Sequence, residues 1–109
     1  MILYGIPTCD TCRKALTALR AAGHAPDFRD IRAEPLAARE IAEFLDVFGE
    51  RLVNRASTTW RNLAADDRDL PPAELLRRYP ALMKRPVIRS DRGLTLGWSA
   101  ATAAHHGAG

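Results

Sequence analysis

The chain has 109 residues, of which 47% are hydrophobic, and a net charge of +3. We expect one domain spanning residues 1–109, with a core large enough to need no covalent staples, and the mild, scattered charge disfavours direct nucleic-acid binding. Neither a bilayer-spanning apolar run nor a signal sequence is recognisable, so we expect a cytoplasmic protein that makes no membrane contact.

The first third of the chain predicts a β-α-β unit. Met1–Gly5 is a short buried strand, and the apolar spacing after it predicts a helix from about Asp10 to Ala22. Gly23 ends this helix, since glycine adopts positive φ at little cost. Phe28–Arg32 is the second predicted strand, and the unit is expected to be parallel and right-handed.

Helices are predicted to dominate the middle of the chain. Pro35 suits the first turn of a helix that runs to about Phe48. Residues 50–83 predict short helices joined by loops, one of them opened by Pro72. The helical insertion as a whole is expected to cover roughly residues 36–83.

The last part of the chain predicts a hairpin and a final helix. Val87–Arg89 and Leu94–Trp98 read as two strands around the turn Ser90–Gly93. Ser99 suits the N-cap of a helix that ends near His106. The predicted fold is therefore α/β, with a mixed four-stranded sheet, flanking helices and a helical insertion between its βαβ and ββα parts.

Cys9 and Cys12 form a C-x-x-C pair where the first strand meets the first helix. A cysteine at a helix N-terminus faces unpaired backbone N–H groups, which together with the helix dipole favour the thiolate. Arg13 and Lys14 add positive charge nearby, whereas Asp10 opposes them. We predict that Cys9 is the low-pKa nucleophile, and that Cys12, one turn further on, resolves a mixed disulfide formed at Cys9.

Two other interpretations of the pair stay open. A zinc site needs four ligands, and His24, His105 and His106 lack the spacing of a zinc finger, so we expect no metal. The two cysteines could instead be inert core residues. A disulfide between them would close too small a loop to stabilise the fold much, and in a reducing compartment such pairs are more often catalytic or metal-binding.

Two arginines are candidates for a place near the cysteine pair. Arg85 and Pro86 precede the third strand, where a cis proline would face the reactive cysteine and the backbone before it could pair with a peptide or glutathione. The alternative is a trans proline that opens an edge strand. Arg61 lies in a polar segment beside Trp60 and is a candidate for binding an anion, although a solvated arginine is the simpler interpretation.

Three segments in the same order resemble the arsenate reductase (ArsC)-like group of the thioredoxin superfamily, which also contains the Spx-type bacterial regulators. They are Tyr4–Ala15, Asn54–Leu63 and Pro80–Val87. The resemblance covers essentially the whole chain and is strongest to the YffB-type branch, regarded as glutathione-dependent thiol reductases. It implies a thioredoxin-like fold of the glutaredoxin type.

The resemblance also implies roles for particular residues. Cys9 would be the nucleophile, Arg61 and Arg85 would hold an oxyanion or a glutathione carboxylate, and Pro86 would be the cis proline. The expected substrate-binding or glutathione-binding set also includes the polar residues of the cysteine loop, Thr8, Asp10 and Thr11.

The chain departs from the arsenate reductases of this group at two places. They carry a small polar residue where Cys12 stands, and a third arginine on the last strand, where this chain reads Leu96-Gly97-Trp98. We expect a monomeric glutathione-dependent thiol–disulfide or arsenate reductase, with glutathione as co-substrate and glutaredoxin or thioredoxin as further candidate partners. The alternative is an Spx-type redox-sensing regulator that binds RNA polymerase.

Overall fold

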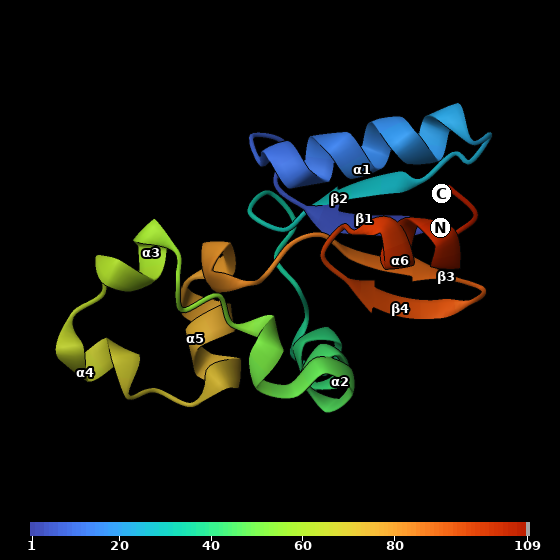
Figure 1. Cartoon of the computed structure of the whole chain (residues 1–109). Helices are drawn as coiled ribbons and strands as arrows, with labels where there is room; N and C mark the ends of the chain where they lie inside the picture. The colour runs from blue at the N-terminus through green and yellow to red at the C-terminus, as the bar shows by residue number, and fades with distance from the viewer. Residues whose placement is uncertain (109) are drawn as a thin grey trace. The chain divides into compact units, whose positions relative to one another are not determined.

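Figure 1 shows the protein as a computed structural model in which residues 1–108 are described. The chain divides into two compact units. The first combines Met1–Ile31 with the chain from Arg85 onward, and the second is Arg32–Lys84. The single-domain interpretation of residues 1–109 stays a prediction, and Gly109 lies outside the described residues.

A four-stranded sheet in the order β2-β1-β3-β4 forms the centre of the first unit. Strand β1 (Ile2–Gly5) pairs in parallel with β2 (Asp27–Asp30) and antiparallel with β3 (Val87–Ser90). Strand β4 (Gly93–Leu96) pairs antiparallel with β3. The mixed four-stranded sheet predicted from the sequence is therefore confirmed.

Helices α1 (Asp10–Ala21) and α6 (Ala100–His105) contact each other in the first unit, and Figure 1 shows α1 running along the sheet. The apolar face of α1 packs against β1 and β3 in a fully buried cluster that consists of Leu3, Cys12, Ala15, Leu19 and Ile88. Burial of this face, more than helix propensity, holds α1 in place.

The predicted ends of both helices are confirmed. Gly23 has a φ of 91°, and its N–H donates to the carbonyl of Arg20 at 3.0 Å, which closes α1 within one residue of the predicted end. Ser99 is the N-cap of α6, where its Oγ accepts the N–H of Thr102 at 3.2 Å. Local capping chemistry alone was enough to predict these ends.

Two predicted strands are shifted in the structure. The second strand is Asp27–Asp30 rather than Phe28–Arg32, because its partner β1 ends at Gly5, which pairs with Asp30. The last strand ends at Leu96 rather than Trp98, because the β3 ladder stops at Val87. Pro86 precedes Val87 and has no N–H to extend the ladder.

The second unit is helical. Its elements are α2 (Ala38–Phe48), η1 (Gly49–Leu52), α3 (Thr58–Arg61), α4 (Ala65–Arg68), α5 (Pro72–Arg78) and η2 (Pro80–Leu82). Helix α2 packs against α5, and their buried apolar residues are Ile41, Phe44, Phe48, Leu75 and Leu76. The prediction that Pro35 lies in the first turn of α2 is wrong. The helix begins at Ala38, and the carboxylate of Glu40 accepts the N–H of Ala37 at 2.8 Å.

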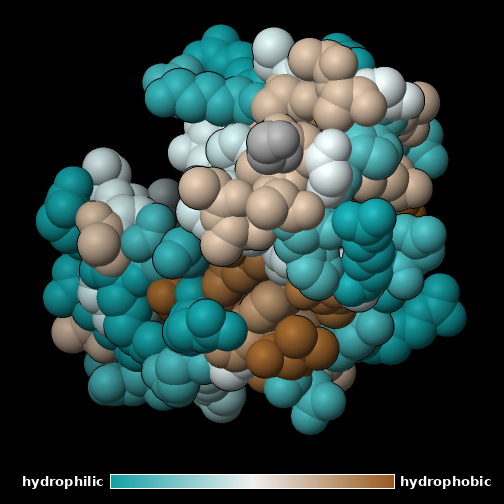
Figure 2. Space-filling model, turned by 45° about the vertical axis from the view of Figure 1, so that its right-hand side comes forward, coloured by the Kyte–Doolittle hydropathy of each residue, from teal (hydrophilic) through white to brown (hydrophobic). Residues whose placement is uncertain are grey.

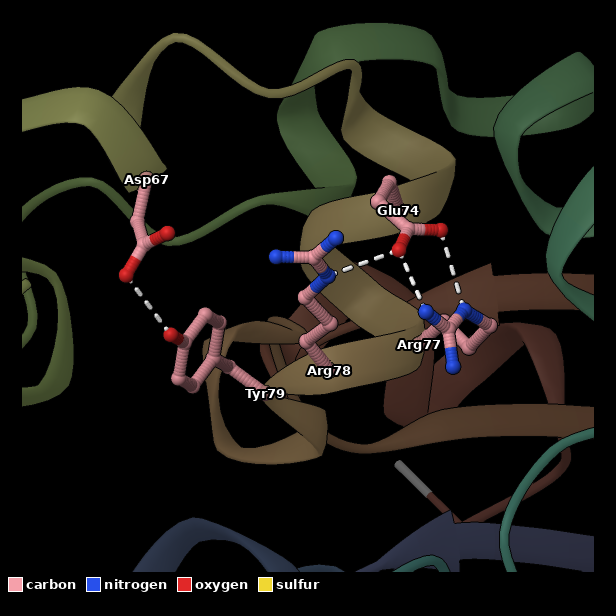
Figure 3. A network of polar contacts seen from close by, with 5 residues as sticks. All are labelled: Asp67, Glu74, Arg77, Arg78 and Tyr79. Atoms are coloured by element: carbon pink, nitrogen blue, oxygen red, sulfur yellow. Dashed lines mark hydrogen bonds and ion pairs between the residues drawn. The ribbon is translucent and has the colours of Figure 1, made fainter.

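Polar side chains reinforce α5 and link it to α4 (Figure 3). Glu74 accepts hydrogen bonds from Arg77 and Arg78, which hold the pKa of Glu74 at about 2. The hydroxyl of Tyr79, just after α5, donates to Asp67 of α4 at 2.8 Å. These contacts fix the C-terminal part of the second unit, which leads into η2 and on to Arg85.

Hydrophilic residues cover most of the face drawn in Figure 2, around a smaller area of strongly hydrophobic ones. On α2, the side chain of Val47 is half exposed. None of the helices formed by residues 1–108 combines the length and the apolar character needed to cross a bilayer.

Candidate active site

Cys9 is the N-cap residue of α1, four residues after the end of β1. Its backbone is extended, with φ −81° and ψ 119°, and its N–H donates to the carbonyl of Ile6 at 3.0 Å. The carbonyl of Cys9 accepts the first hydrogen bond of the helix, from Arg13 at 3.0 Å. The sulfur thus stands where Ser or Asp oxygens usually cap a helix, a position in which a negative charge is stabilised.

Cys12 lies one turn along α1 and differs from Cys9 in exposure. Both residues are free thiols, but Cys9 is partly exposed whereas Cys12 is fully buried in the cluster between α1 and the sheet. A dissolved substrate can therefore reach Cys9 and not Cys12. Residues three apart at the start of a helix lie on neighbouring positions of its surface, so the two sulfurs are close to each other.

The environments of the two thiols move their pKa values in opposite directions. Partial burial acts to raise the pKa of Cys9, but hydrogen bonds from the backbone N–H and thiol of Cys12, and the hydrogen bond and charge of Arg85, lower it below the ordinary value. Burial raises the pKa of Cys12 to about 11, although the N–H of Ile6 acts to lower it, and the neighbouring Cys9 raises it further. At neutral pH, Cys12 is therefore a protonated thiol, which can donate a hydrogen bond to the sulfur of Cys9 and favours the thiolate form of Cys9.

The Arg85–Pro86 peptide bond is cis, as predicted from the sequence. Pro86 is fully buried, and its carbonyl accepts the N–H of Gly97 at 2.8 Å, just beyond the end of β4. Arg85 stands at the entry to β3 and supplies the positive charge that acts on both cysteines. The structure thus brings together Cys9, Cys12, Arg85 and the cis proline within the first unit.

The polar residues of the cysteine loop lie at the surface. Thr8, Asp10 and Thr11 are all exposed, and Asp10 forms an ion pair with Arg13 in the next turn of α1. Because this pair offsets both charges, Asp10 opposes and Arg13 favours a Cys9 thiolate less than the sequence suggests. Thr8 and Thr11 are accessible to a ligand, as the sequence analysis expects for binding residues.

Arg61 belongs to the second unit, at the end of α3. Its guanidinium donates to the carbonyl of Ala56 and to the hydroxyl of Thr58, both at 3.1 Å, so its own segment orients it. The side chain remains exposed. The charged side chain that lowers the pKa of Cys9 within the first unit is that of Arg85. The role of Arg61 beside the thiol stays a prediction.

Trp60 lies between two further arginines, Arg55 and Arg68, which the residue pattern did not indicate as site residues. The guanidinium of Arg55 lies 5.2 Å from the centre of the indole ring, and that of Arg68 lies 5.8 Å from it. Arg68 also donates to the carbonyl of Arg61 at 2.9 Å. The sequence signal for this cluster is the tryptophan among arginines, because cations stack preferentially on indole rings.

Backbone groups at the end of β1 also contribute to the site. Ile6 offers its carbonyl to the N–H of Cys9 and its N–H to the sulfur of Cys12. Because these hydrogen bonds use the backbone of Ile6 and not its side chain, the residue type at position 6 does not predict them. Within residues 1–108, His, Cys, Asp and Glu side chains do not gather in any group of three or more that could hold a metal ion.

A family model described as the ArsC family matches residues 4–105, which include both cysteines and Arg85. The chain belongs to the ArsC family. An uncharacterised protein from Haemophilus influenzae is 35% identical over 102 residues, which cover 89% of this chain and 90% of that protein. The global transcriptional regulator Spx of Listeria innocua is 32% identical over 103 residues, which cover 89% of this chain and 79% of the regulator.

Solved structures of similar chains share the fold. A structure described as the YFFB protein superposes with a TM-score of 0.87 at 32% identity and covers 97% of both chains. An arsenate reductase (ArsC)-related protein from Brucella melitensis gives a TM-score of 0.74 at 37% identity, over 94% of this chain and 91% of that one. The thioredoxin-like ArsC fold expected from the sequence is therefore confirmed.

Proposed function

We propose that this ArsC-family chain is a glutathione-dependent thiol reductase in which Cys9 is the nucleophile. The observation that carries the proposal is the position of Cys9 at the N-cap of α1, with Cys12 and Arg85 lowering its pKa. A thiolate that is accessible and stabilised in this way is the reactive form for attack on sulfur. The proposed substrate is a disulfide or a small oxyanion such as arsenate.

In the disulfide reaction, the Cys9 thiolate attacks one sulfur of the substrate. The substrate S–S bond breaks, a mixed disulfide forms at Cys9, and the leaving thiolate takes a proton from solvent. The negative charge of Cys9 then disappears, and with it one of the causes that raise the pKa of Cys12. Cys12 deprotonates more readily at this stage and can attack the sulfur of Cys9, which breaks the bond between Cys9 and the substrate and releases the second half of the substrate as a thiolate that takes a proton from solvent. Two glutathione thiols would then reduce the Cys9–Cys12 disulfide while being oxidised to glutathione disulfide.

Glutathione binding is proposed from the groups around the thiol. Arg85 can pair with a carboxylate of the tripeptide, and the extended backbone beside the cis Pro86 can pair with its peptide groups. Arg61 is proposed as a second carboxylate-binding residue, and Thr8 and Thr11 as hydrogen-bonding residues. At the end of β4 and just beyond it, Leu96-Gly97-Trp98 provides no arginine, which favours a disulfide over arsenate as the substrate.

Turnover with a small disulfide tests the proposal. Glutathione and hydroxyethyl disulfide are supplied together, glutathione reductase regenerates the reduced tripeptide, and NADPH oxidation is followed. We expect Cys9→Ser to lose essentially all activity above the uncatalysed rate, and Cys12→Ser to retain part of it because glutathione can resolve the mixed disulfide. Full turnover by Cys9→Ser would overturn the proposal, and arsenate in place of the disulfide reports on the oxyanion alternative.

A second candidate function is that of an Spx-type redox-sensing regulator that binds RNA polymerase. It is favoured by the similarity to the Listeria regulator and by the adjacent thiols, which could switch between dithiol and disulfide. A pull-down of RNA polymerase by the immobilised chain separates the two functions. Retention under oxidising but not reducing conditions, lost in Cys12→Ser, would support the regulator, and no retention under either condition would exclude it.

A further inference from the structure

Gly5, the last residue of β1, leaves the space that the sulfur of Cys12 occupies. A Cβ atom added at Gly5 would lie 2.5 Å from the Sγ of Cys12, and 3.3 Å from both its Cβ and the Cδ2 of Leu3. Ordinary contacts between non-bonded heavy atoms are about 3.5–4.0 Å. A side chain at position 5 would therefore displace the sulfur, the first turns of α1, or both.

The need for a glycine at position 5 comes from the lack of space for a side chain beside Cys12 and not from the backbone conformation. The positive-φ glycines of the described chain are Gly23, Gly49, Gly93, Gly97 and Gly107, so Gly5 has a φ open to other residues. Gly5 is itself buried, and its neighbours in β1 pair regularly with β2 and β3. An alanine at this position would keep the strand conformation, and its methyl group would crowd the sulfur of Cys12 most closely and Leu3 less closely.

The sulfur of Cys12 has little freedom to move elsewhere. Cys12 is fully buried, packed in the cluster that contains Leu3, Leu19 and Ile88. In an α-helix, a χ1 near +60° is rare because the side chain meets the preceding turn. Displacement of the sulfur from Gly5 therefore disturbs its alignment with Cys9, which lies at the start of the same helix.

We propose that Gly5 is a positioning residue for the thiol pair: its missing side chain seats the Cys12 sulfur against β1, where Cys12 can donate to Cys9 and later attack it. This inference rests on the proposed role of Cys9 as the nucleophile. Gly5 acts through Cys12 and need not touch substrate. Gly5→Ala is expected to raise the pKa of Cys9 and to slow the resolution of a mixed disulfide by Cys12.

The pH dependence of Cys9 alkylation tests the inference in a double-mutant cycle. Iodoacetamide labelling at Cys9, read by mass spectrometry, is measured for the wild type, Gly5→Ala, Cys12→Ala and Gly5→Ala/Cys12→Ala. We expect Gly5→Ala alone to raise the midpoint of the labelling profile by about 0.5–1 pH unit, which slows labelling roughly 3–10-fold at pH values below the midpoint. In the Cys12→Ala background, where the displaced sulfur is absent, Gly5→Ala should change the pKa of Cys9 little.

Ile88→Val is the matched control, because it loosens the same buried cluster without adding an atom beside Cys12. It is expected to lower the stability by about 1 kcal/mol and to leave the pKa of Cys9 unchanged. An unchanged pKa in Gly5→Ala would overturn the inference, and so would a shift of equal size in the Cys12→Ala background or in Ile88→Val.

If Gly5→Ala does not fold, the comparison moves to the Cys12→Ser background, where a smaller hydroxyl takes the place of the thiol. The pKa of Cys9 should then be higher in Gly5→Ala/Cys12→Ser than in Cys12→Ser, and equal values would overturn the inference. Alkylation requires neither glutathione nor a disulfide substrate. The outcome is therefore independent of whether the chain proves to be a reductase, which the turnover assay decides.

Discussion

The asymmetry between the two cysteines arises at the level of single residues. Cys9 is partly exposed and receives donors from Cys12 and Arg85, whereas Cys12 is fully buried and its thiol faces the negative charge of Cys9. A pair in which both pKa values were low would place two negative charges side by side. In the proposed reaction, this arrangement provides one nucleophile and one hydrogen-bond donor, and the donor becomes a second nucleophile only after the first has reacted.

Arg85 provides a direct test of this electrostatic account. Arg85→Gln removes both the hydrogen bond and the positive charge that lower the pKa of Cys9, so the pKa should rise. We expect the midpoint of the Cys9 alkylation profile to rise by about 0.5–1 pH unit, which slows alkylation roughly 3–10-fold at pH values below the midpoint. Arg92→Gln removes an equal charge at the far end of β3 and should leave the alkylation profile of Cys9 unchanged. Superimposable profiles for Arg85→Gln and the wild type would contradict the assigned role of Arg85.

The residues of the candidate site differ in how far the sequence could predict their positions. The position of Cys9 and Cys12 at the start of α1 could be predicted from their spacing and from the helical pattern that follows them. The cis Arg85–Pro86 bond could be predicted from a proline just before the third strand. The place of Gly5 against Cys12 was not predicted, because it depends on how α1 packs on the sheet. The environment of Arg61 also depends on side-chain contacts within its own segment, which sequence spacing does not specify.

At the scale of elements, pairing partners set the ends of strands and local caps set the ends of helices. The termini of α1 and α6 were predicted closely, because Gly23 and Ser99 act through their own backbone and side chain. The ends of β2 and β4 were not, because each stops where its partner strand stops. Strand length in this sheet is therefore a property of the assembled ladder and not of the residues in one strand.

Helix α6 is attached to the β3–β4 hairpin through two histidines. The ring of His106 hydrogen-bonds Ser90 at 3.0 Å and Thr95 at 2.7 Å, and it is only 2% exposed. Arg92 donates to the carbonyl of His105 at 3.2 Å, and the His105 ring hydrogen-bonds the carbonyl of Arg92 at 2.8 Å. These hydrogen bonds hold the C-terminal end of α6 against the β3–β4 hairpin.

The buried histidine makes the stability of this attachment depend on pH. Burial, together with the charges of His105, His24 and Arg92, lowers the pKa of His106. The unfolded chain therefore binds a proton at about pH 6.5, where folded His106 is still neutral, and the stability falls as the pH drops below about 6.5 and levels off below the folded pKa.

Urea unfolding of His106→Gln at pH 7.5, 6.0 and 5.0 measures this contribution. Glutamine keeps part of the hydrogen bonding but does not titrate, so the loss of stability between pH 7.5 and pH 5.0 should be smaller than in the wild type. His105→Gln is the control and should keep most of the wild-type pH dependence. If His106→Gln and the wild type lose stability in parallel as the pH falls, His106 is not the titrating group.

At the scale of the whole molecule, the first unit consists of two chain segments separated by the helical second unit. Strand β1 pairs with β3, so that Leu3 lies opposite Ile88. Pairing strands that lie so far apart in the chain costs conformational entropy, because a long loop must be closed. The burial and strand pairing of the complete first unit offset this cost. Each unit nevertheless has buried apolar residues of its own, with Leu3, Leu19 and Ile88 in the first and Phe44, Leu52 and Leu75 in the second.

The two tryptophans report separately on the two units and so test the single-domain interpretation. Trp60 lies in the second unit, and Trp98 packs against the buried cluster of the first. In Trp60→Phe and Trp98→Phe, the fluorescence of the remaining tryptophan follows one unit through urea unfolding. A single cooperative domain should give coincident midpoints once the stability of each variant is corrected by its circular dichroism transition.

Phe44→Ala, combined with each single-tryptophan variant, makes the test sharper. Phe44 is fully buried in the second unit, and its truncation should cost about 3–5 kcal/mol, a large part of the roughly 5–15 kcal/mol that stabilises a typical domain. If the chain unfolds as one domain, the signal of Trp98 in the first unit should shift by the same amount as that of Trp60. A lower midpoint for Trp60 with an unchanged midpoint for Trp98 would show that the units unfold independently, and the single-domain interpretation would then be wrong.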